Sequence, residues 1–316
     1  MANNVQVAVV IPVYNEEQTL QVLLDRLMPV MQGLGKSFEI IFIDDGSLDN
    51  SLVLLKEFTK NEQVKVVELT RNYGQHAAIM AGFLINSADI VITMDADLQN
   101  PPEEIPRLIK VMEEGSYDVV GTIRQGRQDS FLRILPSKII NVVARKITGV
   151  RMHDWGCMLR AYRHAVVERM IQCHEHATFI PALATVFGKR ITEIEVSHEE
   201  RFGGKSNYPL RKLINLQFDL VASFSDFPIK LIMYGGIILS FLGVCFGIVL
   251  VIARLAYGAA WAAEGVFTLF AILFVFVGLQ FFALGVLGEY IGRIYGEVRK
   301  RPEYVIENIH CAKGKE

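Results

Sequence analysis

Two long uncharged stretches near the C-terminal end constrain the fold of this chain more than any other feature. Residues 231–253 and 265–288 contain no Asp, Glu, Lys or Arg. Each stretch is long enough for a helix to cross the roughly 30 Å hydrocarbon core of a bilayer. A buried core helix is the alternative for one such run, but two in succession favour the membrane. We therefore predict two transmembrane helices, which also accounts for a hydrophobic fraction of 51% in a chain of 316 residues.

Basic residues lie on the outer sides of both stretches. They are Lys205, Arg211, Lys212 and Lys230 before the first, and Arg293, Arg299, Lys300 and Arg301 after the second. The connector between the stretches, 254–264, has Arg254 as its single base. The positive-inside rule then predicts that both termini, and the whole domain before the stretches, lie in the cytoplasm.

Two further segments, 131–147 and 208–227, mix apolar residues with Lys and Arg. Basic amphipathic helices of this kind lie in the headgroup plane of a membrane, so we predict interfacial helices. Ordinary surface helices that pack on a sheet are the alternative. The predicted organisation is a cytoplasmic domain at 1–228, a transmembrane hairpin at 229–290 and a cytoplasmic tail at 291–316.

The first 122 residues alternate strand-like and helix-like segments. The predicted strands are Val5–Val13, Glu39–Ile43, Val64–Leu69, Asp89–Met94 and Asp118–Gly121, and the predicted helices are Glu16–Met31, Asn50–Thr59, Gln75–Ile85 and Pro102–Glu114. Later strand candidates are Cys157–Tyr162 and Arg190–Val196. This alternation predicts an α/β fold with a mostly parallel sheet covered by helices on both faces. The net charge of −2, without a long basic block, gives no indication of a nucleic-acid partner.

The most informative motif for chemistry follows the apolar run 90–94. Asp95, Asp97 and Gln99 come directly after it, at the carboxyl end of a predicted strand, where open α/β sheets bind their ligands. Carboxylates at this spacing suit Mg²⁺ or Mn²⁺, and such an ion usually also holds substrate phosphates. The alternative is a strand end with solvated acids.

Two other predicted strands end in polar residues at the same edge. The first ends with Pro12 and Val13 and leads into Tyr14 and Glu16, and the second leads into Asp44, Asp45, Gly46 and Ser47. Such convergence is a stronger signal than any single motif. We expect Asp44 to contact a ligand, whereas Ser47 and Asp49 are expected to cap the next helix.

The motifs together resemble those of the family 2 glycosyltransferases of the GT-A fold. They are I-P-V-Y-N-E at 11–16, D-D-G-S at 44–47, R-N-Y-G-Q-H at 71–76, D-A-D-L-Q at 95–99, D-W-G-C-M-L-R-A-Y at 154–162 and L-G-E-Y-I-G-R at 287–293. The similarity covers nearly the whole chain. It points to the polyprenyl-phosphate glycosyltransferases, relatives of dolichol-phosphate mannose synthase, and to the branch that transfers 4-deoxy-4-formamido-L-arabinose.

The resemblance implies roles for particular residues. Donor contacts are expected at Pro12, Tyr14, Glu16, Asp44, Asp95, Ala96 and Arg124, and metal contacts at Asp95, Asp97 and Gln99. Acceptor-phosphate contacts are expected at Arg127, Arg133, Arg201 and Lys205. For Arg127 and Arg133, simple headgroup contact is the alternative. Relatives often have a lysine where this chain has Asn207, so Lys205 is a candidate replacement.

Two acids are candidates for catalysis. Asp97 would act with the metal, and Asp154 would orient the acceptor or take a proton, with a structural turn acid as the alternative. A lipid phosphate is already ionised near neutral pH, so a general base is less necessary than for a sugar hydroxyl.

The resemblance also implies the reaction and its location. A UDP-sugar would donate to undecaprenyl phosphate at the cytoplasmic face of a bacterial inner membrane, in a homotetramer, for lipid A modification and polymyxin resistance. One alternative is a bactoprenol glucosyltransferase. A channel or flippase subunit is a remote one, because two spans with almost no polar residues cannot line an aqueous path alone.

Overall fold

A computed structural model describes residues 5–124, 152–173, 179–197, 199, 227–257, 266–299 and 301–312. The chain divides into two compact units, of which the first comprises Met1–Leu213 and Arg301–Glu316 and the second Ile214–Lys300. The predicted interfacial segment 131–147, and all but the last residue of 208–227, lie outside the described residues.

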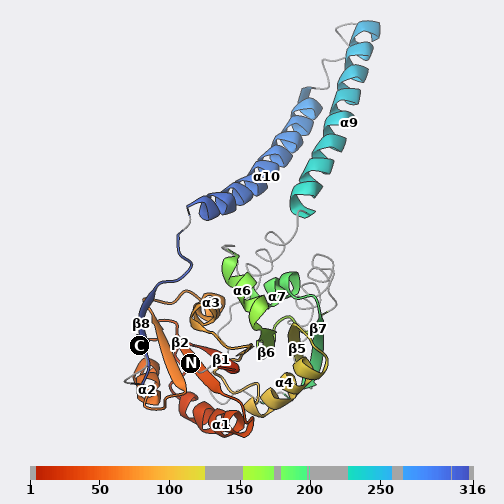
Figure 1. The fold of residues 1–316 in the computed structure, drawn as a ribbon. Coiled ribbons are helices and arrows are strands. Elements are labelled where there is room, and N and C mark those ends of the chain that lie inside the picture. The colour runs from red at the N-terminus through yellow and green to blue at the C-terminus, as the bar shows by residue number, and fades with distance from the viewer. Residues whose placement is uncertain are drawn as a thin grey trace. The chain divides into compact units, whose positions relative to one another are not determined.

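The first unit is built on one eight-stranded sheet with the order β7-β5-β6-β4-β1-β2-β3-β8 (Figure 1). The strands are β1 (Val7–Val13), β2 (Phe38–Asp44), β3 (Val64–Leu69), β4 (Ile90–Thr93), β5 (Val119–Arg124), β6 (Arg160–Arg163), β7 (Ile191–Val196) and β8 (Ile306–His310). Strands β1 to β4 are parallel to one another, and β5 is parallel to β7. Strand β6 runs antiparallel between β4 and β5, so β5 points in the same direction as β4.

Helices cover both faces of this sheet (Figure 1). They are α1 (Leu20–Gly33), α2 (Ser51–Phe58), α3 (Gln75–Ile85), α4 (Ile105–Glu114) with the short 3₁₀ helix η1 (Pro102–Glu104) before it, α6 (His164–Gln172) and α7 (Ile180–Phe187). Alternate residues of β1, such as Val7 and Val9, pack in one core with Leu23 and Leu27 of α1. Helix α3 packs on β1 and β2 from the opposite face (Figure 1). Burial on both faces explains why these strands are continuous apolar runs in the sequence.

The predicted mostly parallel α/β fold is confirmed, and some boundaries differ. Strand β3 and helix α3 match their predicted ranges, whereas α1 begins at Leu20 instead of Glu16. The backbone N–H of Glu16 donates to Ser51 Oγ at 2.9 Å, and that of Glu17 to Asp49 Oδ2 at 3.2 Å. These bonds hold the segment before α1 in a turn against the start of α2, so the helix begins one turn later.

Strand β8 was not predicted from the sequence. It pairs antiparallel with β3 and extends the sheet at that edge. Tyr304, just before β8, donates from its hydroxyl to Met80 O of α3 at 3.4 Å. The chain therefore returns, after the second unit, to the same sheet from which it left.

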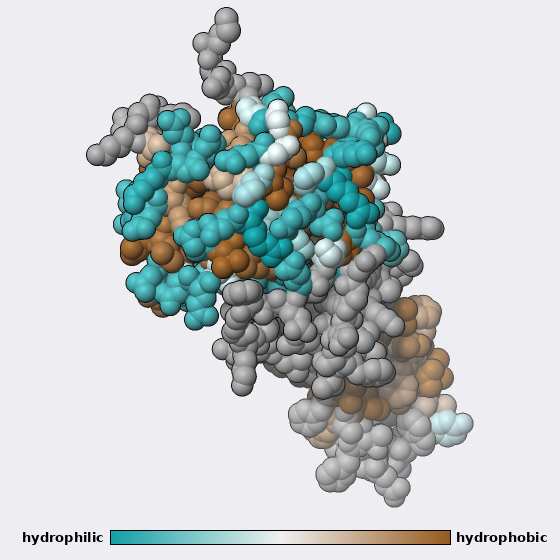
Figure 2. All heavy atoms as spheres, turned by 90° about the horizontal axis from the view of Figure 1, so that it is seen from below, coloured by the Kyte–Doolittle hydropathy of each residue, from teal (hydrophilic) through white to brown (hydrophobic). Residues whose placement is uncertain are grey.

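The second unit consists of helices α9 (Phe227–Tyr257) and α10 (Val266–Val298). Within them, Ile232–Tyr257 and Val275–Gly296 are long and apolar enough to cross a membrane. Large apolar side chains such as Phe241 and Phe281 are more than two-thirds exposed, at 68% and 69%. The described surface of this unit is largely brown in Figure 2, whereas that of the first unit mixes teal and brown. A surface of this kind is typical of a helix that faces lipid.

Candidate active site

A cavity of about 450 Å³ opens at the carboxyl ends of β1, β2 and β4. It is lined by Pro12, Val13, Tyr14, Glu16, Asp45, Asn72, Gly74, Gln75, Asp95, Ala96 and Asp97. The structure thus brings together six residues chosen from the sequence, namely Pro12, Tyr14, Glu16, Asp95, Ala96 and Asp97. Parallel strands deliver their following loops to one edge, which is why segments far apart in the chain meet here.

The loops after β1 and β2 are locked together by side-chain hydrogen bonds. Ser47 Oγ accepts from the Asn15 backbone N–H at 3.1 Å, and Asn15 Oδ1 accepts from the Leu48 backbone N–H at 2.7 Å. Gly46 has a φ of +68°, and a Cβ there would lie 2.5 Å from the carbonyl carbon of Arg71. Only glycine fits this turn, so the D-D-G-S motif also brings the loop after β3 to the cavity.

The two acids of that motif have different surroundings. Asp44 accepts from the Ser47 backbone N–H at 3.2 Å through Oδ2, while its buried Oδ1 has no partner among the described residues. Burial raises the pKa of Asp44. Asp45 accepts from the backbone N–H groups of Tyr73 and Gly74, at 2.7 and 2.9 Å. Asp45 therefore fixes the start of α3, and Asp44 keeps an oxygen for another donor.

Asp95 and Asp97 present two acids to the same cavity. Burial and the neighbouring charge of Asp97 raise the pKa of Asp95 to about 7, although Arg124 and Gln75 act in the opposite direction. Leu98 has a φ of 62°, and Asp97 Oδ1 accepts from the Gln99 backbone N–H at 3.1 Å, so this loop is a tight turn. Like charges held together favour binding of a cation.

In the described part of the chain, no third acid, His or Cys joins the carboxylate pair to complete a protein-only metal site. Among the described residues, no group of three or more such side chains could hold a metal ion. Two carboxylates fit an ion that takes its other ligands from substrate phosphates and water. Gln99, the third predicted metal contact, does not line the cavity; its carbonyl accepts from the Glu199 backbone N–H at 3.0 Å.

Gln75 is a site residue that sequence reasoning missed. It is the first residue of α3, and its Nε2 donates to Asp95 Oδ1. Gly74 and Gln75 line the cavity, so the positive end of the α3 dipole faces it, as in many anion sites. The R-N-Y-G-Q-H motif at 71–76 was the available signal, although it did not identify which residue reaches Asp95.

Arg124 and Asp154, predicted to have separate roles, form one ion pair. Arg124 Nε donates to Asp154 Oδ2 at 2.7 Å, and Nη2 donates to Oδ1 at 3.0 Å. Arg124 ends β5 at the same edge of the sheet as Asp95. The other predicted acceptor contacts, Arg127, Arg133, Arg201 and Lys205, lie outside the described residues.

Comparison with known proteins places this chain among sugar transferases. The family model "Glycosyl transferase family 2" matches residues 8–171. The chain is 54% identical over 306 residues to undecaprenyl-phosphate 4-deoxy-4-formamido-L-arabinose transferase of Proteus mirabilis, covering 96% of this chain and 94% of that protein. It is 53% identical over 305 residues to the transferase of the same name from Edwardsiella ictaluri, covering 96% and 94%.

A solved structure shares the fold at low sequence identity. It is glucosyl-3-phosphoglycerate synthase from Mycobacterium tuberculosis in complex with Mn²⁺, UDP-glucose and phosphoglyceric acid. The TM-score is 0.50 and the identity 19%, covering 69% of this chain and 78% of that one. The GT-A class expected from the sequence is therefore confirmed. The family match includes every residue that lines the cavity, and together with the near-full-length relatives it establishes that the chain belongs to glycosyl transferase family 2.

Proposed function

We propose that this chain transfers 4-deoxy-4-formamido-L-arabinose from a UDP donor to undecaprenyl phosphate. The named activity of relatives at 53% and 54% identity over 96% of the chain supports the donor and the acceptor. The structural observation that carries the chemistry is the carboxylate pair Asp95 and Asp97 in a cavity faced by the start of α3. A nucleotide diphosphate is the ligand that such a pair, bridged by a cation, would hold.

The reaction would be a single displacement with inversion. An oxygen of the lipid phosphate forms a bond to the anomeric carbon while the bond from that carbon to the diphosphate oxygen breaks and UDP departs. A Mg²⁺ or Mn²⁺ ion held by Asp95 and Asp97 would neutralise the charge that develops on the diphosphate. Gln75 keeps Asp95 in place through its hydrogen bond. Arg124, at the same edge of the sheet, adds positive charge for the same anion.

Asp44 and Tyr14 would bind the nucleotide. The buried Asp44 Oδ1 without a partner among the described residues can accept an N–H of the uracil base, which would remove the cost of leaving it unsatisfied. Tyr14 is 43% exposed and lines the cavity, so its ring offers a flat apolar surface to the base. Neutralising Asp44 should therefore raise the KM for the donor more than it lowers kcat.

The helical unit would anchor the enzyme in the bacterial inner membrane, with the sheet domain in the cytoplasm. The distribution of Lys and Arg supports this orientation. Strand β8 adds a topological argument. Strand β8 pairs with β3 in the sheet that precedes α9. Two membrane crossings would place both ends of the helical hairpin on one side of the membrane, which fits this pairing. The homotetramer implied by resemblance stays a prediction.

The test is a panel of UDP-sugars incubated with the membrane-embedded enzyme and undecaprenyl phosphate, with separation of the lipid products. We expect a product with the formamido-arabinose donor and little with UDP-glucose; the reverse result would support the glucosyltransferase alternative. Asp97→Ala should abolish product formation. Asp25→Ala is the matched control, since Asp25 is an exposed residue of α1 that accepts a surface bond from Gln21. Normal turnover by Asp97→Ala would contradict the proposal.

A further inference from the structure

Arg160 is a buried cation at the catalytic edge that the reaction described above does not use. It begins β6, lies opposite Thr93 at the end of β4, and has an exposed fraction of 0%. Among the described residues no carboxylate pairs with its guanidinium. A buried charge is costly unless polar groups around it compensate, so its hydrogen bonds matter.

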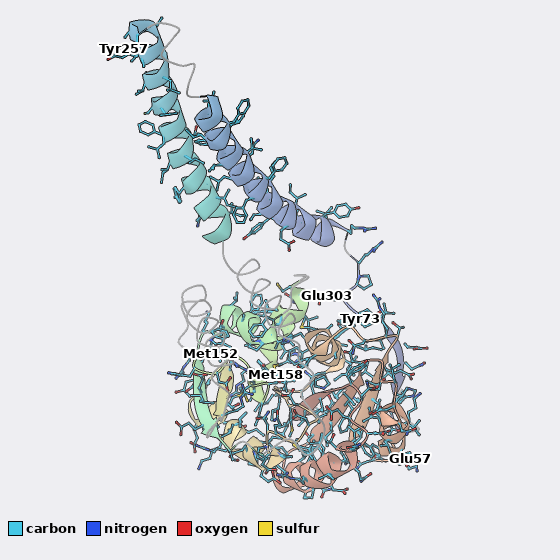
Figure 3. The ribbon with its side chains drawn as sticks, turned by 180° about the vertical axis from the view of Figure 1, so that it is seen from behind. Glu57, Tyr73, Met152, Met158, Tyr257 and Glu303 are labelled. Carbon is cyan, nitrogen blue, oxygen red and sulfur yellow. The ribbon has the colours of Figure 1, made fainter. Side chains whose placement is uncertain are left out.

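The guanidinium of Arg160 holds one loop at three points. Nε donates to Cys157 O at 2.8 Å, Nη2 donates to Asp154 O at 2.7 Å, and Nη1 lies 3.7 Å from Met152 Sδ. The loop is flanked by Met152 and Met158, which are labelled in Figure 3. An apolar side chain in place of Arg160 would leave two buried carbonyl groups unsatisfied.

The same loop is also held from strand β7, which lies beyond β5 in the sheet. Glu193 accepts from the His153 backbone N–H at 2.9 Å and from the Asp154 backbone N–H at 3.4 Å. The loop backbone is therefore fixed on one side by a cation that binds its carbonyls and on the other by an anion that binds its N–H groups. The position of the Asp154 carboxylate follows from these bonds.

The Asp154 carboxylate in turn holds Arg124. Asp154 is buried, and each of its oxygens accepts one N–H of the Arg124 guanidinium. Oδ1 also accepts from the Gly156 backbone N–H at 3.0 Å. A Cβ at Gly156 would lie 3.1 Å from Arg124 Nη2, so the loop closes tightly on the arginine. Both oxygens that a general base would use are thus engaged by an arginine.

We infer that Arg160 and Asp154 are positioning residues that act through Arg124, and that Asp154 is not the base of the reaction. The inference rests on the proposed function, in which Arg124 adds positive charge for the donor diphosphate; its charge already acts on Asp95 of the cavity. A guanidinium has five N–H groups, and Asp154 takes one from Nε and one from Nη2. These two hydrogen bonds fix the plane of the Arg124 guanidinium and leave its remaining N–H groups for the diphosphate.

A double-mutant cycle tests the link between Asp154 and Arg124. Asp154→Asn keeps the shape of the side chain but removes the charge that holds the arginine. We expect it to lower kcat/KM by about ten- to a hundredfold in the wild-type background. In an Arg124→Lys background the same change should cost less than about threefold, because the geometry it protects is already lost. Independent, multiplying losses would overturn the inference.

The pH profile gives a readout that separates positioning from proton transfer. If Asp154 only positions Arg124, then kcat/KM of Asp154→Asn should be lower at every pH, with the limbs of the profile unchanged. If Asp154 takes a proton from the acceptor, the variant should lose the acidic limb of the profile. That loss would overturn the inference.

Arg160 is tested against a matched arginine on the same strand. Arg163, at the other end of β6, also donates to two backbone carbonyls, Tyr117 O and Met112 O, both at 3.3 Å. We expect Arg160→Met to weaken UDP binding in the presence of Mn²⁺ by about tenfold, and Arg160→Lys to recover part of it. Arg163→Met should stay within about twofold of wild type. An equal loss of UDP affinity in Arg160→Met and Arg163→Met would overturn the inference, because Arg160 would then contribute only to general stability.

Calorimetric titration with UDP and Mn²⁺ keeps this test separate from the proposed function. The measurement needs neither the sugar nor the lipid. If the wild-type enzyme does not bind UDP, the proposed function fails. If it binds UDP, and the folded Arg160→Lys and Asp154→Asn variants bind it as tightly, only the positioning inference fails. A thermal melt of each variant shows which of them are folded.

Discussion

Two acids on the same sheet show how differently one type of side chain can be used. Asp95 follows β4 at the cavity, where burial and the neighbouring Asp97 raise its pKa to about 7. Glu68 lies in β3 at the edge covered by β8, and His310 Nε2 and Lys56 Nζ lie 2.8 and 3.0 Å from its Oε2. These partners lower the pKa of Glu68 despite its partial burial.

The difference separates a site from a structural contact. The acid at the cavity is crowded by another acid, and Gln75 and Arg124 do not offset this, so it would gain stabilisation from a bound cation. The acid at the edge is bound by Lys56 of α2 and His310 of β8, so it stabilises the fold without a ligand. A change at Asp95 should therefore lower activity without a loss of stability, whereas a change at Glu68 should lower stability without a loss of activity.

The largest expected effect is on activity at Asp95. Asp95→Asn should lower turnover by about a thousandfold or more, since a bound metal contributes several kcal/mol to stabilising the transition state. The same variant should raise the unfolding temperature by about 2–4 °C, because the repulsion from Asp97 is relieved. Thermal melts without metal, together with the lipid-product assay, measure both quantities. If Asp95→Asn lost stability together with activity, Asp95 would contribute to the fold as Glu68 does, and the expected difference between the two acids would be wrong.

The next largest effect is on folding, at the other edge of the sheet. Truncation after Arg301 removes β8, leaves the backbone of β3 unpaired and takes away His310. We expect a loss of several kcal/mol in the free energy of unfolding and a tendency to aggregate through the exposed edge. Truncation after Ala312, which keeps β8, is the matched control. Wild-type stability of the shorter chain would mean that β8 contributes nothing to the domain.

The sequence predicted the elements that depend on local contacts and missed the one that depends on distant contacts. Strand β3 and helix α3 were predicted with the correct limits, because an apolar strand and a helix that begins after Gly74, at a φ of 96°, are local patterns. Strand β8 has five residues, and its His310 contacts an acid 242 residues earlier. No local pattern indicates such a pairing.

In the candidate site, too, the sequence predicted residues that follow a local pattern and missed contacts between distant residues. Asp95 and Asp97 were found because they follow a strand directly. The pairing of Arg124 with Asp154, 30 residues later, depends on the antiparallel β6 that brings the two together, so the sequence suggested a separate role for each. The bonds from Arg160 to the Asp154 and Cys157 carbonyls were missed because the burial of an arginine at the start of a strand is not visible in a linear sequence.

A smaller effect is expected from Glu68→Gln. The side chain of Glu68 is 14% exposed, so its ion pairs are partly shielded, whereas Lys56 is 42% exposed and screened by solvent. We expect a loss of about 1–2 kcal/mol in the free energy of unfolding, with kcat/KM unchanged. Glu57→Gln is the control, since Glu57 is an exposed acid on α2 (Figure 3). A fall in kcat/KM would show that this edge is coupled to the cavity.

The smallest effect is the pH dependence of the contribution that Glu68 makes to the free energy of unfolding. An acid whose pKa is lowered in the folded state stabilises the fold fully above its unfolded pKa, which for Glu68 is 4.5. The contribution is lost as the pH falls through the lower folded value. The difference in unfolding free energy between wild type and Glu68→Gln should therefore stay constant from neutral pH down to about 5 and shrink below 4.5. Denaturant titrations of both proteins across this range measure the difference. If it shrank near neutral pH instead, the loss would not come from protonation of the Glu68 carboxylate.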